Sequence, residues 1–461
     1  MRESTGIVTF GAAKECITPS ERTTLIGFGP VFGVPFECVH DDLYVRTLML
    51  EDGQGERVVL MGFDLLFHDD TLTERLRAYA QEKYAVKPGN LHVNYSHTHF
   101  APAVRGYDRH YHTDSYEAFL LERCCACMDR AFLDTCEGTV EFAAVEGDWN
   151  MSRRLPQGNG KTKFAPNPEG DRDPNLYLLR LRDKGGDLRA LLTSFACHPS
   201  NLAELNAVSA EYPGRLCTLL EQRYPGCTAL FFQGFGADTK LKKGAVEDKF
   251  IPLSYEQLDE VAGFMADAVQ VRLTCGGWQA VPLMLGGKAF TVELPLEPNG
   301  REFYEMERAK CSGRSGHPGE GFVPTENAGQ TAENSFRLMW SCADYVAENY
   351  DSLPDTITLN CGVVRLNPDF YLFSVGGEPV VSLQTVLREA FPDKQILCFG
   401  YNDAIAYIPS DKVIAEGGYE AGESADLEYR LKGRPKLGVD AICVNGFRRA
   451  LEELAKQDMP G

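Results

Sequence analysis

Residues 91–99 (Leu-His-Val-Asn-Tyr-Ser-His-Thr-His) connect an apolar, strand-like segment directly to two histidines, His97 and His99. In an extended chain, side chains two positions apart point to the same face, with their Cα atoms about 6–7 Å apart. A single metal ion could therefore be bound by one or both imidazoles. The pair is equally typical of two hydrogen-bonded histidines at the end of a strand, so this motif alone leaves both interpretations open.

Strand-like and helical segments alternate on both sides of this stretch. A helical pattern at residues 71–84 precedes it, and a strand-like run at 188–196 is followed by a helical pattern at 212–222 and a strand at 228–233. Residues 370–401 hold a further strand–helix–strand unit. This order predicts an α/β fold, in which chemistry tends to be located where strands end.

Composition and charge exclude several classes of protein. The 461 residues are 44% hydrophobic and 24% charged, which is ordinary for a globular chain, and the net charge of −20 disfavours binding to nucleic acid. No apolar run approaches the ~18 residues of a membrane helix, and the N-terminus lacks the apolar core of a signal peptide. We therefore expect a cytoplasmic protein without stable membrane insertion that acts on a small molecule. Homo-oligomerisation stays open.

The fifteen cysteines do not form a recognisable disulfide or zinc framework. Their number is odd and their spacing is irregular, so we expect thiols. The one cluster, Cys124, Cys125 and Cys127, lies in a segment where apolar residues recur at helical spacing. Buried packing is the favoured role for this cluster, with a metal or redox role as the alternative.

Further polar residues follow other strand-like runs. His198 ends the run at 188–196, a glycine-rich turn after 228–233 leads to Asp238, and Glu378 follows Gly376-Gly377. Each motif alone is explained by a turn or by a hydrogen-bonded core residue. Together they make a convergent site plausible, because two histidines, a glutamate and one more oxygen ligand form a reasonable zinc-binding set.

Two polar segments interrupt the alternating pattern. Residues 158–173 and 296–335 are rich in charged residues, and the second also holds six glycines. We expect both to be long loops. A polar, glycine-rich insertion in a compact α/β protein is often functional, so residues 296–335 are predicted to form a lid or substrate loop.

The order of the motifs resembles the catalytic domain of the neutral/alkaline (non-lysosomal) ceramidase family. The matches run over roughly residues 7–425 in the family's order and are Gly11-Ala12-Ala13, Ile17-Thr18-Pro19, Asp64, Ser96-His97-Thr98-His99 with Pro102, Ala196-Cys197-His198-Pro199, Glu211-Tyr212-Pro213-Gly214, Phe232-Gln233-Gly234 with Asp238, Gly377-Glu378, and Tyr407 with Tyr419. Several ordered motifs are far more specific than any one. The resemblance implies a single catalytic domain over residues 1–461, with mixed β-sheets and flanking helices.

The resemblance also implies a set of site residues. In the family a catalytic zinc ion (Zn2+) is held by two histidines, a glutamate and a tyrosine, which correspond here to His97, His198, Glu378 and Tyr407. His99 would lie beside the metal and stabilise an oxyanion. The position of a family active-site arginine is matched by Arg153, or else by Arg154, and Tyr419 matches another active-site tyrosine.

The sequence departs from the family in two respects. The family has a serine shortly after the Gly-Asp of the third motif, where this chain has Lys240, so serine-dependent amide cleavage is in doubt. The chain also ends about where the catalytic domain ends, before the C-terminal immunoglobulin-like domain, and it has no export signal. We therefore expect a lipid substrate at a membrane surface less than a small polar one.

The leading hypothesis is a zinc hydrolase in which metal-activated water attacks an amide-like or related bond of a small polar substrate. Asp238 or Lys240 would transfer a proton if its side chain reaches that water. One alternative is a zinc-dependent lyase or isomerase that acts on a sugar-like substrate. The other is a non-catalytic homologue that binds a metal or ligand without turnover.

Overall fold

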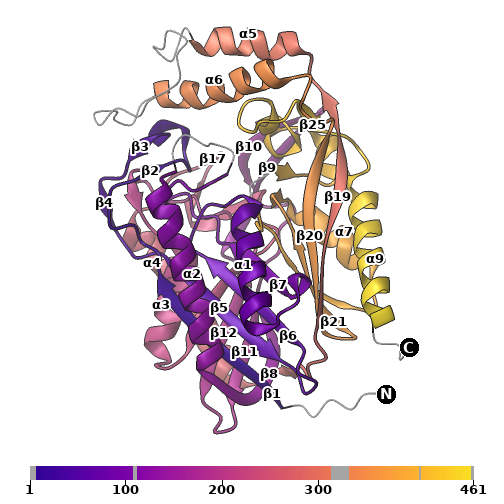
Figure 1. The fold of residues 1–461 in the computed structure, drawn as a ribbon. Coiled ribbons are helices and arrows are strands. Elements are labelled where there is room, and N and C mark those ends of the chain that lie inside the picture. The colour runs from indigo at the N-terminus through magenta and orange to yellow at the C-terminus, as the bar shows by residue number, and fades with distance from the viewer. Residues whose placement is uncertain (1–6, 107–111, 313–331, 404–405, 458–461) are drawn as a thin grey trace.

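Two β-sheets lie face to face, with helices on their outer sides (Figure 1). The computed structural model describes residues 7–106, 112–312, 332–403 and 406–457. The first sheet has the order β14-β12-β11-β8-β1-β5-β6-β7, with β18 also paired to β8. Its strands are β1 (Val8–Cys16), β5 (Tyr44–Glu51), β6 (Arg57–Phe63), β7 (Leu91–Tyr95), β8 (Thr135–Glu146), β11 (Asn175–Asp183), β12 (Leu188–Phe195), β14 (Thr228–Gln233) and β18 (Gln279–Ala280).

The second sheet has the order β23-β21-β20-β19-β25. Its strands are β19 (Gly286–Pro298), β20 (Thr356–Asn367), β21 (Phe370–Val375), β23 (Gln395–Phe399) and β25 (Gly433–Pro435). Parallel pairs (β6 with β7, β12 with β14, β21 with β23) occur among antiparallel ones in both sheets. The prediction of an α/β fold with mixed β-sheets and flanking helices is therefore confirmed.

Smaller strands pair outside these two sheets. A three-stranded sheet joins β10 (Lys161–Asn167), β9 (Asn150–Gly158) and β15 (Thr239–Leu241). The two-stranded pairs are β2 (Thr24–Leu25) with β3 (Val34–Pro35), β4 (Cys38–Val39) with β13 (Ala207–Val208), β16 (Ala245–Val246) with β17 (Lys249–Phe250), and β22 (Glu378–Pro379) with β24 (Tyr407–Ile408). Four of these small strands, β9, β15, β22 and β24, carry residues that the sequence places at the site.

Apolar side chains from both sheets form one core between them. Leu192 and Phe232 of the first sheet belong to the same cluster as Leu372 and Phe399 of the second, and the rings of Phe232 and Phe399 are 4.9 Å apart. Burying such side chains contributes about 1.5–3 kcal/mol each. The core therefore fixes the ends of the two sheets relative to each other.

The helices cover the outer faces of the sheets. On the first sheet lie α1 (Asp70–Tyr84), α2 (Asp114–Leu133), α3 (Glu211–Arg223) and α4 (Tyr255–Cys275), and on the second lie α7 (Val381–Ala390) and α9 (Val439–Gln457). Helix α2 begins where Thr113 accepts a hydrogen bond from the N–H of Tyr116. Its buried side chains include Cys124 and Cys127, and all fifteen cysteines of the chain are free thiols. The predicted helical packing of this cysteine cluster is confirmed.

The two segments expected to be long loops have more regular structure than predicted. Most of residues 158–173 belongs to the hairpin formed by β9 and β10. The second segment contains all of helix α5 (Arg301–Ser312) and the first residues of α6 (Ala332–Asn349). Residues 313–331 lie outside the described residues. Helices α5 and α6 pack as a pair through Tyr304, Val346 and Ala347. The expectation of a continuous loop over residues 296–335 is therefore wrong at both ends.

Among the described residues, none of the helices has the length and apolar character needed to cross a membrane.

Asn94, fully buried at the end of β7, links the two sheets. Its Oδ1 accepts a hydrogen bond from the N–H of Gln233 at 2.7 Å, and its Nδ2 donates to the carbonyls of Gln233 at 3.1 Å and Gly400 at 2.7 Å. The N–H of Gly400 also donates to the carbonyl of Gln233. The Asn94 amide thus provides hydrogen-bond partners for the backbone of Gln233, the last residue of β14, and of Gly400, which follows β23.

Replacing Asn94 by leucine should destabilise the protein by about 3 kcal/mol, because buried backbone groups lose their partners. Chemical denaturation followed by circular dichroism measures this loss. The matched control is Asn445→Leu on the exposed side of α9, which should change stability by no more than about 0.5 kcal/mol. Equal stability of the two variants would contradict the linking role of Asn94.

Candidate metal centre

The segment that carries His97 and His99 turns sharply where β7 ends. The N–H of Ser96 donates to the carbonyl of Phe63 and that of His97 donates to the carbonyl of Leu65, which holds His97 at a left-handed φ of 64°. A non-glycine residue in this region is strained and persists only when its surroundings fix it. The expectation that the two histidines share a face of an extended strand is therefore wrong. The turn, not strand alternation, brings their rings together, with centroids 4.9 Å apart.

His198 joins this pair from the end of β12. Nε2 of His99 lies 2.9 Å from Nε2 of His198, and the His97 and His198 ring centroids are 4.7 Å apart. One nitrogen from each of the three rings lies within 4.8 Å of the others, so the group could hold a metal ion. The N–H of His99 donates to the carbonyl of Pro199, which ties the two histidine segments directly together.

Backbone carbonyls orient two of the three imidazoles. Nδ1 of His97 donates to the carbonyl of Leu66 at 2.9 Å, and Nδ1 of His99 donates to the carbonyl of Gly27 at 2.5 Å. Each ring therefore presents the lone pair of Nε2 to the centre, as metal-binding histidines commonly do. Gly27 is required by this close approach, because a Cβ atom there would lie 2.1 Å from the carbonyl oxygen of His99.

Glu378 and Tyr407 are register partners in the parallel pair β22–β24. Oε2 of Glu378 lies 3.2 Å from Nε2 of His97 and 3.9 Å from Nε2 of His198. Its other oxygen, Oε1, accepts a hydrogen bond from the hydroxyl of Tyr429 at 2.5 Å. The structure thus turns one carboxylate oxygen towards the histidines and holds the other in place.

The protonation states of these groups suit a cation. Burial, with His97 and nearby cations adding to it, lowers the pKa of His99 and the pKa of His198 well below the ordinary histidine value, so both rings are neutral at neutral pH. Burial alone would raise the pKa of Glu378, but His97 and the hydrogen bond from Tyr429 outweigh it and keep the carboxylate ionised. Neutral imidazoles and a carboxylate are the ligands that zinc and related metals prefer.

Three buried atoms of the histidines and Glu378 lack hydrogen-bond partners, namely Nδ1 of His198, Nε2 of His97 and Oε2 of Glu378. Nε2 of His97 and Oε2 of Glu378 face each other without an aligned hydrogen bond. A buried polar atom without a partner is unfavourable by about 1–3 kcal/mol. A metal ion between the rings and the carboxylate would satisfy Nε2 of His97 and Oε2 of Glu378, so the donor set fits a bound metal.

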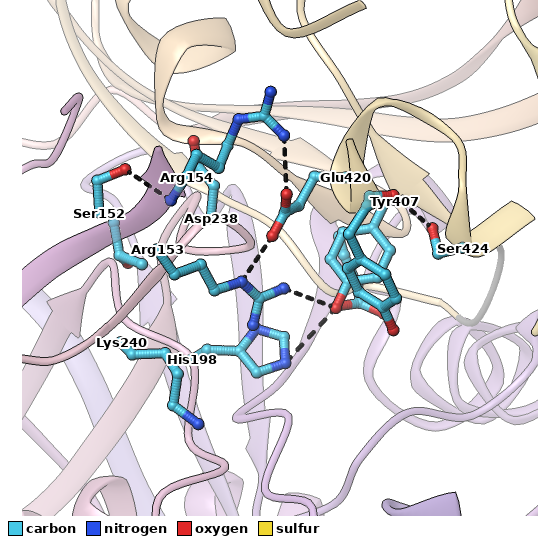
Figure 2. A network of polar contacts seen from close by, with 12 residues as sticks. Ser152, Arg153, Arg154, His198, Asp238, Lys240, Tyr407, Glu420 and Ser424 are labelled. Atoms are coloured by element: carbon cyan, nitrogen blue, oxygen red, sulfur yellow. Dashed lines mark hydrogen bonds and ion pairs between the residues drawn. The ribbon is translucent and has the colours of Figure 1, made fainter. Parts of the chain in front are cut away.

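Glu420 holds the two candidate arginines in different positions (Figure 2). Arg153 donates from Nε to Glu420 at 2.7 Å and from Nη2 to the hydroxyl of Tyr407 at 3.0 Å. Arg154 donates to the other oxygen of Glu420 at 2.8 Å and to the carbonyl of Gly417. Of the two arginines, Arg153 lines the cavity beside the histidines. Arg153 is therefore the better match to the family's active-site arginine.

A cavity of about 400 Å³ opens onto the metal centre. Its wall is polar around the histidines. It is apolar where residues that follow β2, and residues of β10 and α6, line it. The lining residues that this account uses are His97, His99, Arg153, Phe164, His198, Ser200, Lys240, Leu338, Met339, Glu378, Tyr407, Tyr419, Glu428 and Tyr429. Helix α6 and the β9–β10 hairpin thus supply walls of the cavity, although neither is a loop.

Lys240 and Asp238 occupy different places relative to this cavity. Lys240 lines it and donates from Nζ to the carbonyl of Ser200 at 2.8 Å and to its hydroxyl at 3.2 Å. Asp238 is buried, and its Oδ1 accepts a hydrogen bond from the N–H of Val381 at the start of α7. Its backbone carbonyl also accepts from the N–H of Arg153. Asp238 is thus placed to fix backbone around the site, not to face the cavity.

Two further motif carboxylates also bind backbone. Oδ2 of Asp64 accepts from the N–H of Tyr44 and from buried Arg46. Glu211 accepts from the backbone and side-chain N–H groups of Asn201 and from its neighbour Tyr212. Both motifs therefore stabilise the scaffold around the cavity.

Glu428 and Tyr429 were not predicted from the sequence. The Tyr419 hydroxyl donates to Glu428, and burial raises the pKa of that carboxyl to about 7. Tyr429, the next residue, orients Glu378. Both lie in an irregular segment without strand or helix periodicity, and the only sequence signal is an acidic residue beside a tyrosine.

Comparison with known proteins gives a clear answer for the fold. The neutral ceramidase from Pseudomonas aeruginosa superposes with a TM-score of 0.70 at 15% identity, over 98% of this chain and 75% of that chain. A ceramidase complexed with C2 gives a TM-score of 0.70 at 16% identity and the same coverage. This chain has the neutral ceramidase fold. No protein-family model and no curated protein matches the sequence, so the ceramidase-like fold is present in a divergent chain.

Protein purified without added metal should contain about one transition-metal ion per chain, because the centre offers one set of converging ligands. Elemental analysis measures this content. His97→Ala and His198→Ala should each lose most of it, whereas His40→Ala, on an exposed ring stacked on Tyr255, should retain it. Absence of metal in the wild type, or unchanged content in both cavity variants, would contradict the metal centre.

Proposed function

We propose that this protein is a zinc-dependent hydrolase that cleaves an amide-like bond of a small polar substrate. The observation that carries the proposal is the convergence of three imidazoles and the Glu378 carboxylate on one point at the floor of a cavity. The ceramidase-like fold supports the reaction class, since the superposed structures are ceramidases by name. In this proposal His97, His198, Glu378 and Tyr407 hold the zinc ion.

Zinc bound at such a centre supplies Lewis-acid polarisation of a carbonyl and activates water at neutral pH. The protein groups around it would orient the substrate and exclude bulk water. Tyr407 is held by Arg153 and packs 5.2 Å from the ring of Tyr419. The Nδ1–H of His99 is bound to Gly27, so its Nε2, 2.9 Å from Nε2 of His198, is the ring nitrogen that would face the reacting group.

Arg153 and Tyr419 are suited to positioning. The guanidinium of Arg153 lies 5.0 Å from the ring centroid of Phe164 and is fixed by Glu420, so its place at the cavity wall is defined before substrate binds. Tyr419 is fixed through Glu428. Pre-positioned groups of this kind reduce the entropic barrier to reaction. Lys240 lines the same cavity at the position where the ceramidase family has a serine.

Hydrolysis is tested by oxygen labelling. With a panel of N-acylated and glycosidic small molecules in ¹⁸O-water, one product should gain a single labelled oxygen, because water supplies the new bond in hydrolysis. Mass spectrometry of the products makes the measurement. A product with unchanged total mass would indicate a lyase or isomerase, and retained zinc without turnover on the whole panel would indicate a non-catalytic binding protein. Either result would contradict the proposal.

His99→Ala separates the roles of the histidines. If His99 assists the reaction without holding zinc, this variant should keep its zinc content and lose activity by about 100-fold or more, as expected for loss of an acid–base or oxyanion-stabilising group. Zinc content and kcat are measured on the same preparation. Loss of zinc from His99→Ala would place His99 among the ligands and contradict the proposed ligand set.

The wild-type protein should show negligible turnover of long-chain ceramide and measurable turnover of a small polar N-acyl compound. The charged groups of Arg153 and Lys240 beside the histidines disfavour a long apolar chain in that part of the cavity. Thin-layer chromatography of ceramide in detergent micelles, beside the polar panel, tests this. Robust ceramide cleavage would overturn the polar-substrate proposal while leaving the hydrolase proposal intact.

A further inference from the structure

Lys240 is a cation of the cavity wall without a carboxylate partner. Its Nζ donates only to the carbonyl and hydroxyl of Ser200, and it forms no ion pair within the described part of the chain. The neighbouring cation Arg153 differs, because Glu420 pairs with it at 2.7 Å. Two neutral acceptors leave the ammonium charge of Lys240 uncompensated by direct contact.

The acidic residue that acts electrostatically on Lys240 is committed to other bonds. Glu211 influences Lys240 through space, but its two carboxylate oxygens accept hydrogen bonds from Asn201 and from the N–H of Tyr212. The other cavity carboxylates are also engaged, Glu378 by Tyr429 and Glu428 by Tyr419. Each acidic group near the cavity therefore has a partner of its own, and Lys240 pairs directly with none of those described.

A buried cation is unfavourable without an anionic partner. Burial and the positive charge of Arg153 lower the pKa of Lys240 to about 8, which still leaves the ammonium form in excess at neutral pH. An anion that entered the cavity would give Lys240 a favourable electrostatic partner, such as the one that Asp64 provides for buried Arg46 at 2.6 Å.

We propose that the substrate carries a carboxylate and that Lys240, with the hydroxyl of Ser200 beside it, binds this group. The inference rests on the proposed function for the reaction and adds the substrate class: a small N-acyl compound with a free carboxylate. The cavity wall then carries two sets of groups with different tasks. Lys240 and Ser200 hold the carboxylate, while the histidines and Glu378 face the bond to be cleaved. Lys240 thereby acts as a specificity-determining residue.

Geometry favours this role over proton transfer. Lys240 is in β15 opposite Met151 of β9, so strand pairing on that side fixes its backbone, and its Nζ is held by two bonds to one residue. A group held in this way presents its remaining N–H to the cavity in a defined direction. The position that carries a serine in the ceramidase family thus holds a charged anchor in this chain.

The test compares two probes that differ only in charge. Binding of N-acetylglycine and of its uncharged analogue N-acetylglycinamide is measured by isothermal titration with the zinc-loaded full-length protein. The wild type should bind the carboxylate at least about tenfold more tightly, the usual advantage of a charge-assisted hydrogen bond. In Lys240→Met the difference should fall to within about threefold, and Lys240→Arg should restore part of it.

Lys243→Met is the matched control. Lys243 is three positions away, exposed and paired with Glu260, so its loss should leave the preference for the carboxylate unchanged. Circular dichroism and zinc content confirm that each variant is folded, and Lys240→Gln replaces Lys240→Met if the latter is not. A wild type that binds the two probes equally, or binds neither up to roughly 20 mM, would overturn the proposal.

Retention of the preference in a folded Lys240→Met or Lys240→Gln variant would overturn it as well, because another cation or the metal would then bind the carboxylate. These outcomes are independent of the proposed hydrolysis. Probe discrimination is a binding measurement, so it can succeed where no substrate is turned over. Conversely, incorporation of ¹⁸O from water into the products of uncharged substrates would support hydrolysis, even if the binding test disproved the role of Lys240.

Discussion

The amide of Asn94 makes three hydrogen bonds to backbone groups of Gln233 and Gly400, and these bonds join the ends of β7, β14 and β23. The surrounding backbone continues the same connection. The N–H of Gly234 donates to the carbonyl of Phe195, and that of Tyr401 donates to the carbonyl of Gly377. Every strand that delivers a residue to the metal centre is therefore tied to its neighbours within a few residues of that centre, across both sheets.

This connection explains why strained backbone persists there. His97 and Tyr401 both have positive φ, at 64° and 57°, and the N–H of Tyr95 donates to the carbonyl of Tyr401. Such conformations are unfavourable by about 1–3 kcal/mol each and are kept only where the surroundings determine them. The strain has a geometric result: it turns His97 out of the strand direction, so that its ring meets His99 and His198.

The sequence indicates much of this arrangement because its strongest motifs follow apolar strands. His97, His198 and Glu378 could be predicted to converge because each follows an apolar strand, whereas Tyr407 was indicated only by the resemblance to the ceramidase family. The left-handed turn at His97 could not be predicted, because it depends on bonds to Leu65 and Phe63 that are distant in sequence. The roles of these residues in catalysis stay predictions.

Other features were hidden for different physical reasons. Helix α5 was missed because the six glycines that suggested a loop all lie outside it, five at residues 313–329 and Gly300 just before its start, while Tyr304 and Cys311 are buried on one face of the helix. Glu420, Glu428 and Tyr429 act through contacts between irregular segments, where neither periodicity nor strand ends provide a signal. Such contacts arise only once the tertiary structure is formed.

The most direct test of the metal centre is a crystal structure of protein purified without added metal, with diffraction collected on both sides of the zinc absorption edge. The account predicts one strong anomalous difference peak, present only above the edge, within about 2.0–2.3 Å of Nε2 of His97, Nε2 of His198 and Oε2 of Glu378. No peak among these atoms, or a peak bound by other residues, would contradict it.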